Sequence, residues 1–501
     1  MQSNRSCGSV LIHSRLRNLC GLSGLCGELF AARIHRSDAE NTGLTPRVNQ
    51  TRTLPFLQMR IPRLTTAIFL SPCRAIMAAA ILHVLLTVSV FSVGRLGLFP
   101  SQFNRDGIGE FARDGYRFRD QANSLADALT EGEVGSWIKD NTTFHAKVLS
   151  LDFALMRPLF GSNILAAEPV NLFYYLAILA LCFSLARVVA GRRAAWLASA
   201  IVGLWPSLLL HTTQFMRDPL IILTILALLL VLARLLKKTQ TWRSAAICGV
   251  MSTPACFLLW MCRREIWPVV GAIIVLGLML LLIRILRERK LLAWNLAVIG
   301  LLCVLTIAVP RIMRSPKPLL PEKVNDFRRN PDPSFLGVLT WTRKEFIRES
   351  REKSGSMIDA DINFSNRADV IKYIPRALEI GYLSPFPTMW FTAGYNVGMI
   401  GRLVGGVETL LTYMIEALAC VFVWRRRRHL NTWLMFLTTT IGVLALGIVV
   451  VNLGTLYRMR YPFWILMVIM AAGTLTSRRG YLSRKRTASL APALSEQLQS
   501  D

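Results

Sequence analysis

Long apolar stretches, most of them separated by short charged connections, recur along the chain from residue 75 onward. An apolar stretch of about 17 to 25 residues with few charges is long enough to cross a bilayer as a helix. Stretches of this kind lie at residues 75–94, 169–188, 194–210, 219–236, 244–261, 267–285, 291–310, 404–424, 432–454 and 461–477. The pattern therefore predicts an all-α polytopic membrane protein with about ten transmembrane helices.

Two polar stretches, residues 100–168 and 311–403, are too long to be simple connectors between spans. The resulting parts are a basic N-terminal extension (1–76), a transmembrane module (77–310) that includes the first outer loop (100–168), a second outer loop (311–403), C-terminal transmembrane helices (404–477) and a tail (478–501). The extension is rich in Arg and Ser, which is typical of a transit peptide or of a start codon assigned too far upstream, with Met59 and Met77 as alternative starts.

Basic residues indicate the orientation of the spans, because Lys and Arg gather in short loops on the cytoplasmic side. They occur in alternate connections, at residues 187–193, 234–243, 284–290, 425–428 and 478–486. We therefore expect these loops and both termini to be cytoplasmic, and the two long polar stretches to face outward from a bacterial inner membrane. The net charge of +28 follows largely from this arrangement, and no basic patch carries the interleaved aromatic residues of a nucleic-acid-binding surface.

The composition excludes an ordinary soluble protein and contains no metal signature. Hydrophobic residues make up 53% of the chain, and the mean hydropathy is +0.43. The 10 Cys residues have neither zinc-binding nor redox spacing, so we expect no disulfide framework and no structural metal. No cofactor is predicted, and a divalent cation bound without a sequence signature is left open.

Every short outer turn carries arginine, although arginine is otherwise gathered on the inner side. In HTTQFMRDPL (211–220) the Arg-Asp pair lies directly beside a bilayer-length apolar run, where charge is costly. Two interpretations stay open: each arginine reaches the headgroups or a neighbouring acid, or all of them share one anion site, since guanidinium binds phosphate through two parallel hydrogen bonds. The residues concerned are Arg217, Asp218, Arg263, Arg264, Arg458 and Arg460.

The first outer loop places carboxylates near the expected membrane surface. From Tyr116 onward it has the pattern of an amphipathic helix, with Leu125 and Leu129 on one face. Its acids either balance neighbouring arginines at the surface or supply a general base for an acceptor hydroxyl or amine. They are Asp106, Glu110, Asp114 and Asp120.

Two further features allow alternative interpretations. Glu408 and Glu416 lie inside a predicted span, two helical turns apart and so on one face, where they either line a cavity or pair with a neighbouring helix. The basic and aromatic loop 311–403 is either a re-entrant or interfacial segment packed on the bilayer or a lid over an acceptor site.

Several motifs follow one another in a recognisable order. They are Asp114-Gly115-Tyr116 in the first outer loop, FHAKVLSLDFALMRPLFGSNILAAEPVNLFYYL (144–176), GRRAAWLASAIVGLWPSLLLHTTQFMRDPL (191–220), YIPRALEIGYLSPFPTMW (373–390) and NLGTLYRMRYPFW (452–464). Together they resemble the C-type (GT-C) glycosyltransferases, and more narrowly the bacterial protein O-mannosyltransferase and aminoarabinose-transferase type. The resemblance covers residues 77–477 and implies a C-type fold.

The resemblance also implies an activity, the transfer of a sugar from a polyprenyl-phosphate-linked donor to a lipid, glycan or protein acceptor at the outer face of the membrane. In that family an acid of the first outer loop is the catalytic base, which implies Asp114 first and Asp106 second. The outer-turn arginines would then bind the donor phosphate, with Asp218 in an orienting role. The implied partners are the lipid-linked donor and membrane lipids.

Two other classes of protein stay open. An O-antigen polymerase or ligase would also be polytopic, but it would need histidine in its large outer loop, and residues 311–403 contain none. A transporter or non-enzymatic membrane protein would be expected to have repeated halves or Gly/Pro-broken spans around a charge in the middle of the membrane. The sequence has no internal repeat.

Overall fold

The structure, a computed structural model, describes residues 72–140, 142–313, 334–351, 357–391 and 398–477. Most of the predicted N-terminal extension, including Met59, lies outside these residues, as do the tail 478–501 and parts of the second outer loop. The alternative start Met77 falls inside the first described helix.

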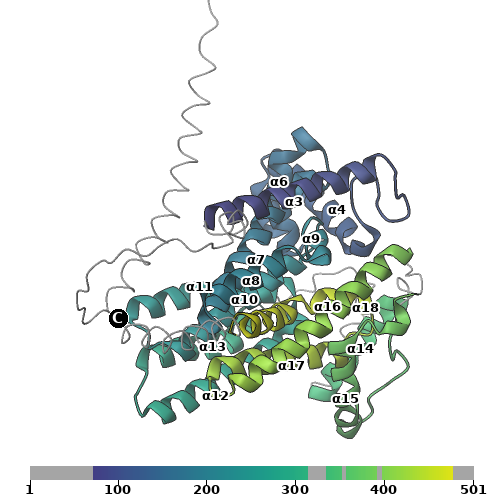
Figure 1. The fold of residues 1–501 in the computed structure, drawn as a ribbon. Helices are drawn as coiled ribbons and strands as arrows, with labels where there is room; N and C mark the ends of the chain where they lie inside the picture. Colours follow the sequence, from purple (N-terminus) through teal and green to yellow (C-terminus); the bar gives the residue numbers. More distant parts are fainter. Residues whose placement is uncertain (1–71, 141, 314–333, 352–356, 392–397, 478–501) are drawn as a thin grey trace, which may run out of the picture. The chain divides into compact units, whose positions relative to one another are not determined.

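Helices account for the regular structure of the described ranges, apart from isolated β-bridges (Figure 1). Within these ranges, eight helices are long and apolar enough to cross a membrane. They are α3 (Pro72–Arg95), α7 (Glu168–Val189), α10 (Asp218–Lys237), α11 (Trp242–Cys262), α12 (Trp267–Glu288), α13 (Ala293–Ile312), α16 (Gly398–Arg425) and α17 (Leu430–Val449). The predicted all-α polytopic fold is confirmed.

Two predicted spans are bent helix pairs. The first joins α8 (Arg192–Gly203) to α9 (Pro206–Thr212) at 66°, and the second joins α18 (Leu453–Met459) to the helix Tyr461–Ser477 at 54°. The first break has a local cause, because Pro206 disfavours helical geometry in the preceding residue, and Trp205 is extended. If each pair is one span, the total is 10, which agrees with the prediction.

The first outer loop folds into α4 (Asp114–Thr130), α5 (Val134–Lys139) and α6 (Phe144–Phe160). The buried side chains of α4 recur at helical spacing, as predicted for an amphipathic helix, and include Phe118, Ala122 and Leu125. This apolar face packs against α6. The apolar face of α4 is therefore covered by protein.

The described part of the second outer loop contains α14 (Phe335–Arg351) and α15 (Arg367–Leu383). Helix α15 packs along α17, at Gly381 and Gly447. Arg343 of α14 is buried and donates hydrogen bonds to the carbonyls of Asp359, Ile362 and Ile448, which ties the loop to the end of α17. The described loop is thus anchored to a span.

Helix α10 is the most enclosed of the described spans, since 89% of its most apolar 18-residue segment is buried. It contacts α7, α11, α12 and α17 (Figure 1). A helix surrounded in this way is apolar on all sides, as the run IILTILALLLVLA is. Its first residue is the buried Asp218.

Candidate functional site

The turn between α9 and α10 is pinned to the first outer loop by Gln214. The backbone N–H of Gly109 donates to Gln214 Oε1 at 2.9 Å, and Gln214 Nε2 donates to the carbonyl of Gly107 at 3.3 Å. Asn171 of α7 donates to the carbonyl of Gln214 at 3.3 Å. These bonds satisfy polar groups that burial would otherwise leave unpaired, and they fix the backbone that leads to Arg217.

Asp218 lies between two arginines from other turns. Its Oδ1 is 3.5 Å from Arg263 Nη1, and its Oδ2 is 3.7 Å from Arg458 Nη1. Asp218 begins α10, Arg263 separates α11 from α12, and Arg458 belongs to α18. Tertiary structure thus brings together charges from all three of the arginine-bearing outer turns.

Arg458 also reaches Asp114, the first residue of α4. Its Nη2 is 3.3 Å from Asp114 Oδ2, while its Nη1 is 3.6 Å from the sulfur of Met216. Gly115, which follows Asp114, packs beside Ile108 and Phe215. The Asp114 side chain is 51% exposed, so it forms the open side of the cluster.

Arg217 lies at the same place with a different set of contacts. Its Nη1 donates to the carbonyl of Cys262 at 3.0 Å, and its guanidinium lies 5.9 Å from the ring centroid of Phe118. Cys262 directly precedes Arg263 in the chain. Arg217, Arg263, Arg458, Asp114 and Asp218 are called the arginine cluster below.

The arginine cluster has more positive than negative charge, with three guanidinium groups and two carboxylates. Burial lowers the pKa of Arg263 to about 10, and the charge of Arg217 acts in the same direction, opposed by Asp218. Like charges held together at a partly buried place repel one another. A bound anion would relieve that repulsion.

Asp114 is held in its ionised form. Partial burial acts to raise the pKa of its carboxyl group, but the charges of Arg458, Arg217 and Arg117 outweigh this effect. The pKa of Asp114 therefore lies below its ordinary value. Asp114 can accept a proton, although the neighbouring positive charge makes it a weaker base than an isolated aspartate.

The remaining predicted residues lie elsewhere. Arg264 is exposed and lies over the ring of Trp260 at 5.7 Å. Arg460 is buried, and its Nη1 donates to the carbonyls of residues 381, 382 and 384 at the end of α15. Asp106 pairs with Arg119 at 2.6 Å. Arg264 follows Arg263 directly, and Arg460 lies two residues after Arg458. Each of these arginines lies at a break between helices, where the side chains of neighbouring residues point in different directions.

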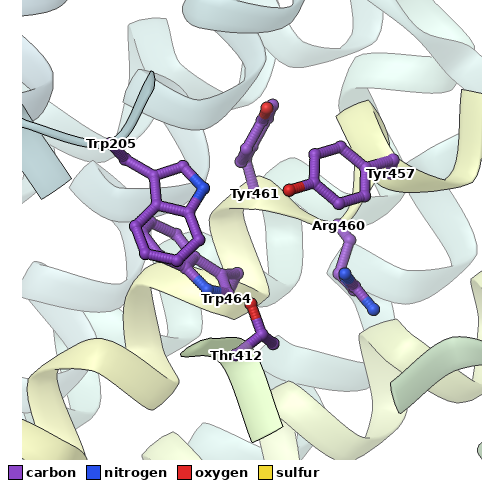
Figure 2. Close-up of a pocket in the computed structure, with 6 residues that line it drawn as sticks. All are labelled: Trp205, Thr412, Tyr457, Arg460, Tyr461 and Trp464. Carbon is purple, nitrogen blue, oxygen red and sulfur yellow. The ribbon is translucent and has the colours of Figure 1, made fainter. Parts of the chain in front are cut away.

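The sequence did not reveal the partners of Glu408. Its carboxylate accepts the backbone N–H of Ser207 at 2.8 Å, the Ser207 hydroxyl and the Tyr457 hydroxyl. Beside this group is a pocket lined by residues of both bent pairs and α16 (Figure 2). Its lining residues are Trp205, Thr412, Tyr457, Arg460, Tyr461 and Trp464. In the sequence, the one feature that pointed to this group was Glu408 itself, an acidic residue inside an apolar span.

No metal site accompanies the cluster in the part of the chain that the structure describes. There, no group of three or more His, Cys, Asp or Glu side chains is arranged to hold a metal ion.

Two solved structures resemble this chain. ArnT from Cupriavidus metallidurans, solved bound to undecaprenyl phosphate, has 14% sequence identity and a TM-score of 0.40, over 82% of this chain and 63% of ArnT. The archaeal oligosaccharyltransferase AglB from Archaeoglobus fulgidus, solved with an inhibitory peptide and a dolichol-phosphate, has 14% identity and a TM-score of 0.44, over 83% of this chain and 52% of AglB. The chain thus spans less than two thirds of either protein.

Both likenesses concern the overall fold. Neither a protein-family model nor a curated protein matches the sequence.

Proposed function

We propose that the protein is a membrane glycosyltransferase that transfers a sugar from a polyprenyl-phosphate-linked donor to an acceptor at the outer face of the membrane. The observation that carries the proposal is the arginine cluster, in which Arg217, Arg263 and Arg458 gather beside an ionised Asp114. The excess positive charge suits a phosphate, and guanidinium groups match phosphate geometry. The lipid part of the donor follows from the sequence resemblance.

The proposed reaction uses the two kinds of charge in the cluster. A hydroxyl or amine of the acceptor attacks the anomeric carbon of the sugar, and a bond forms between them. The bond from the anomeric carbon to the phosphate oxygen breaks, and its electrons remain on the leaving polyprenyl phosphate. The arginines stabilise the charge that develops there. Asp114 takes the proton of the acceptor.

Binding of two lipids tests the phosphate site. Undecaprenyl phosphate and undecaprenol differ only in the phosphate, so the purified protein in nanodiscs should bind the phosphate lipid more tightly. Arg458→Gln should lower the affinity for undecaprenyl phosphate about tenfold or more, as expected for the loss of a charge-assisted hydrogen bond. Arg264→Gln, the control from outside the cluster, should bind as the wild type does. Equal affinity of the wild type for both lipids would contradict the proposal.

Transfer itself is measured with a polyprenyl-phosphate-linked sugar that carries a label in the sugar. Wild-type protein should release free polyprenyl phosphate and pass the label to an acceptor in the membrane. Transport would instead move the label across the membrane with the donor intact.

A transporter is the second candidate, favoured by one observation. Two bent helix pairs meet at Glu408, a buried acid in a span-length helix. Broken helices around a charge within the membrane are typical of transporter sites. The fate of the donor bond in the labelled-sugar assay separates the two candidates.

A further inference from the structure

Glu408 joins the two bent helix pairs. It belongs to α16, where it is 3% exposed. Its Oε1 accepts the N–H of Ser207 in the first turn of α9, and its Oε2 accepts the hydroxyl groups of Ser207 and of Tyr457 in α18. The Tyr461 hydroxyl donates to Ser207 Oγ at 2.8 Å and adds a second link between the pairs. Figure 2 shows Tyr457 and Tyr461 on either side of the second bend.

Both elements held by Glu408 lead to the arginine cluster. Helix α9 ends at Thr212, and the buried turn that follows it ends in Arg217. Tyr457 directly precedes Arg458 in α18. Two arginines that must converge on one phosphate are therefore carried by segments that meet at a single carboxylate.

The second acid of α16 provides a comparison. Glu416 lies two turns further along the same helix, is half-buried, and its Oε1 has no hydrogen-bond partner in the described structure. A buried carboxylate is costly unless its oxygens accept hydrogen bonds. At Glu408 three donors from two other elements meet that requirement, which gives α9 and α18 a fixed separation.

We propose that Glu408 is a positioning residue for the phosphate site: it holds α9 and α18 together so that Arg217 and Arg458 reach the same anion. This inference rests on the proposed function. Glu408 itself does not touch the arginine cluster in the described contacts, and it acts through Ser207 and Tyr457.

Affinity for the two lipids tests the inference. Glu408→Gln places an amide N–H₂ against the groups that donate hydrogen bonds to Glu408. The loss of roughly one hydrogen bond should displace the arginines and weaken undecaprenyl phosphate binding about tenfold. Binding of undecaprenol should stay unchanged, because the neutral lipid does not need the arginines. Glu416→Gln, the matched control on the same helix, should change neither affinity. If Glu408→Gln instead loosened the whole fold, the affinities for both lipids would fall together, which would contradict the positioning role.

A double-mutant cycle identifies the partner. Tyr457→Phe removes one donor to Glu408, so the double variant Glu408→Gln/Tyr457→Phe should bind undecaprenyl phosphate no more weakly than Glu408→Gln alone. Fully additive losses would overturn the inferred link through Tyr457.

Arg458→Gln separates this inference from the proposed function. If Arg458→Gln loses phosphate binding while Glu408→Gln retains it, the positioning role is wrong and the phosphate site stands. If neither variant loses phosphate binding, the phosphate site itself is wrong.

Discussion

At the scale of single residues, Arg458 connects the proposed base to the proposed phosphate site. One of its terminal nitrogens contacts Asp114 and the other contacts Asp218. The arginines that hold the pKa of Asp114 below its ordinary value are those that an anionic donor would neutralise. Donor binding would therefore make Asp114 a stronger base at the moment when a base is needed.

Asp114→Asn keeps the shape of the side chain and removes the proton acceptor. We expect the transfer rate to fall about 10²- to 10⁴-fold, the usual cost of losing a general base. Binding of undecaprenyl phosphate should persist, because the arginines remain. Asp106→Asn is the control, since Asp106 pairs with Arg119 away from the cluster. Full activity of Asp114→Asn together with loss in Asp106→Asn would move the base to Asp106.

The pH profile of the wild type gives an independent check on Asp114. The lowered pKa means that the free protein keeps its base ionised until the pH falls below the ordinary aspartate value of about 3.9. The acid limb of kcat/KM, which reports the free protein, should therefore lie at lower pH than the acid limb of kcat, which reports the donor complex. Coincident limbs would show that the donor does not neutralise the arginines beside Asp114.

At the scale of elements, glycines allow α15 to lie against α17. A methyl group on Gly447 of α17 would lie 2.0 Å from the carbonyl oxygen of Ala377 in α15, and one on Gly381 would lie 2.5 Å from Val443. The end of α15 also receives the hydrogen bonds of Arg460, at the bend beside α18. The described part of the second outer loop therefore supports the helix that carries Arg458.

Gly447→Ala should destabilise the protein by about 1–3 kcal/mol, the usual cost of overpacking, because the backbone of Ala377 would have to move. Thermal unfolding in detergent measures the effect as a lower Tm. Gly300→Ala is the matched control: Gly300 is on the exposed face of α13, with no atom near the added methyl group. The Tm of Gly300→Ala should be unchanged or slightly higher, since alanine favours the helix more than glycine does. An unchanged Tm in Gly447→Ala would contradict the close packing of α15 on α17.

At the scale of the whole molecule, the orientation in the membrane determines which solution the arginine cluster faces. The basic loops predict that the cluster and the second outer loop face outward, with both termini inside. A donor that carries its sugar on the outer leaflet would then reach Asp114.

Cysteine labelling in intact cells tests this topology in a cysteine-free background. Lys344→Cys, on an exposed position of α14, should react with a membrane-impermeant reagent, and Arg427→Cys, in the loop after α16, should be protected. Both should react after the cells are opened. Labelling of position 427 alone in intact cells would reverse the orientation.

The sequence by itself determined the helical spans, because a bilayer requires each span to be apolar and to satisfy its backbone hydrogen bonds within the segment. The amphipathic helix of the first outer loop was readable for the same local reason, since its buried residues recur at helical spacing. The sequence also pointed to the outer arginines, as costly charges beside apolar runs.

Only the tertiary structure decided which of these charges meet. Arg263 and Arg264 are equivalent in the sequence, as are Arg458 and Arg460, yet helix breaks direct one of each pair to Asp218 and the other away from it. Glu408 finds its partners 201 and 49 positions away, at distances along the chain that no local pattern encodes. Helix periodicity is a local property of the chain, whereas the meeting of charges depends on how the bent helices pack.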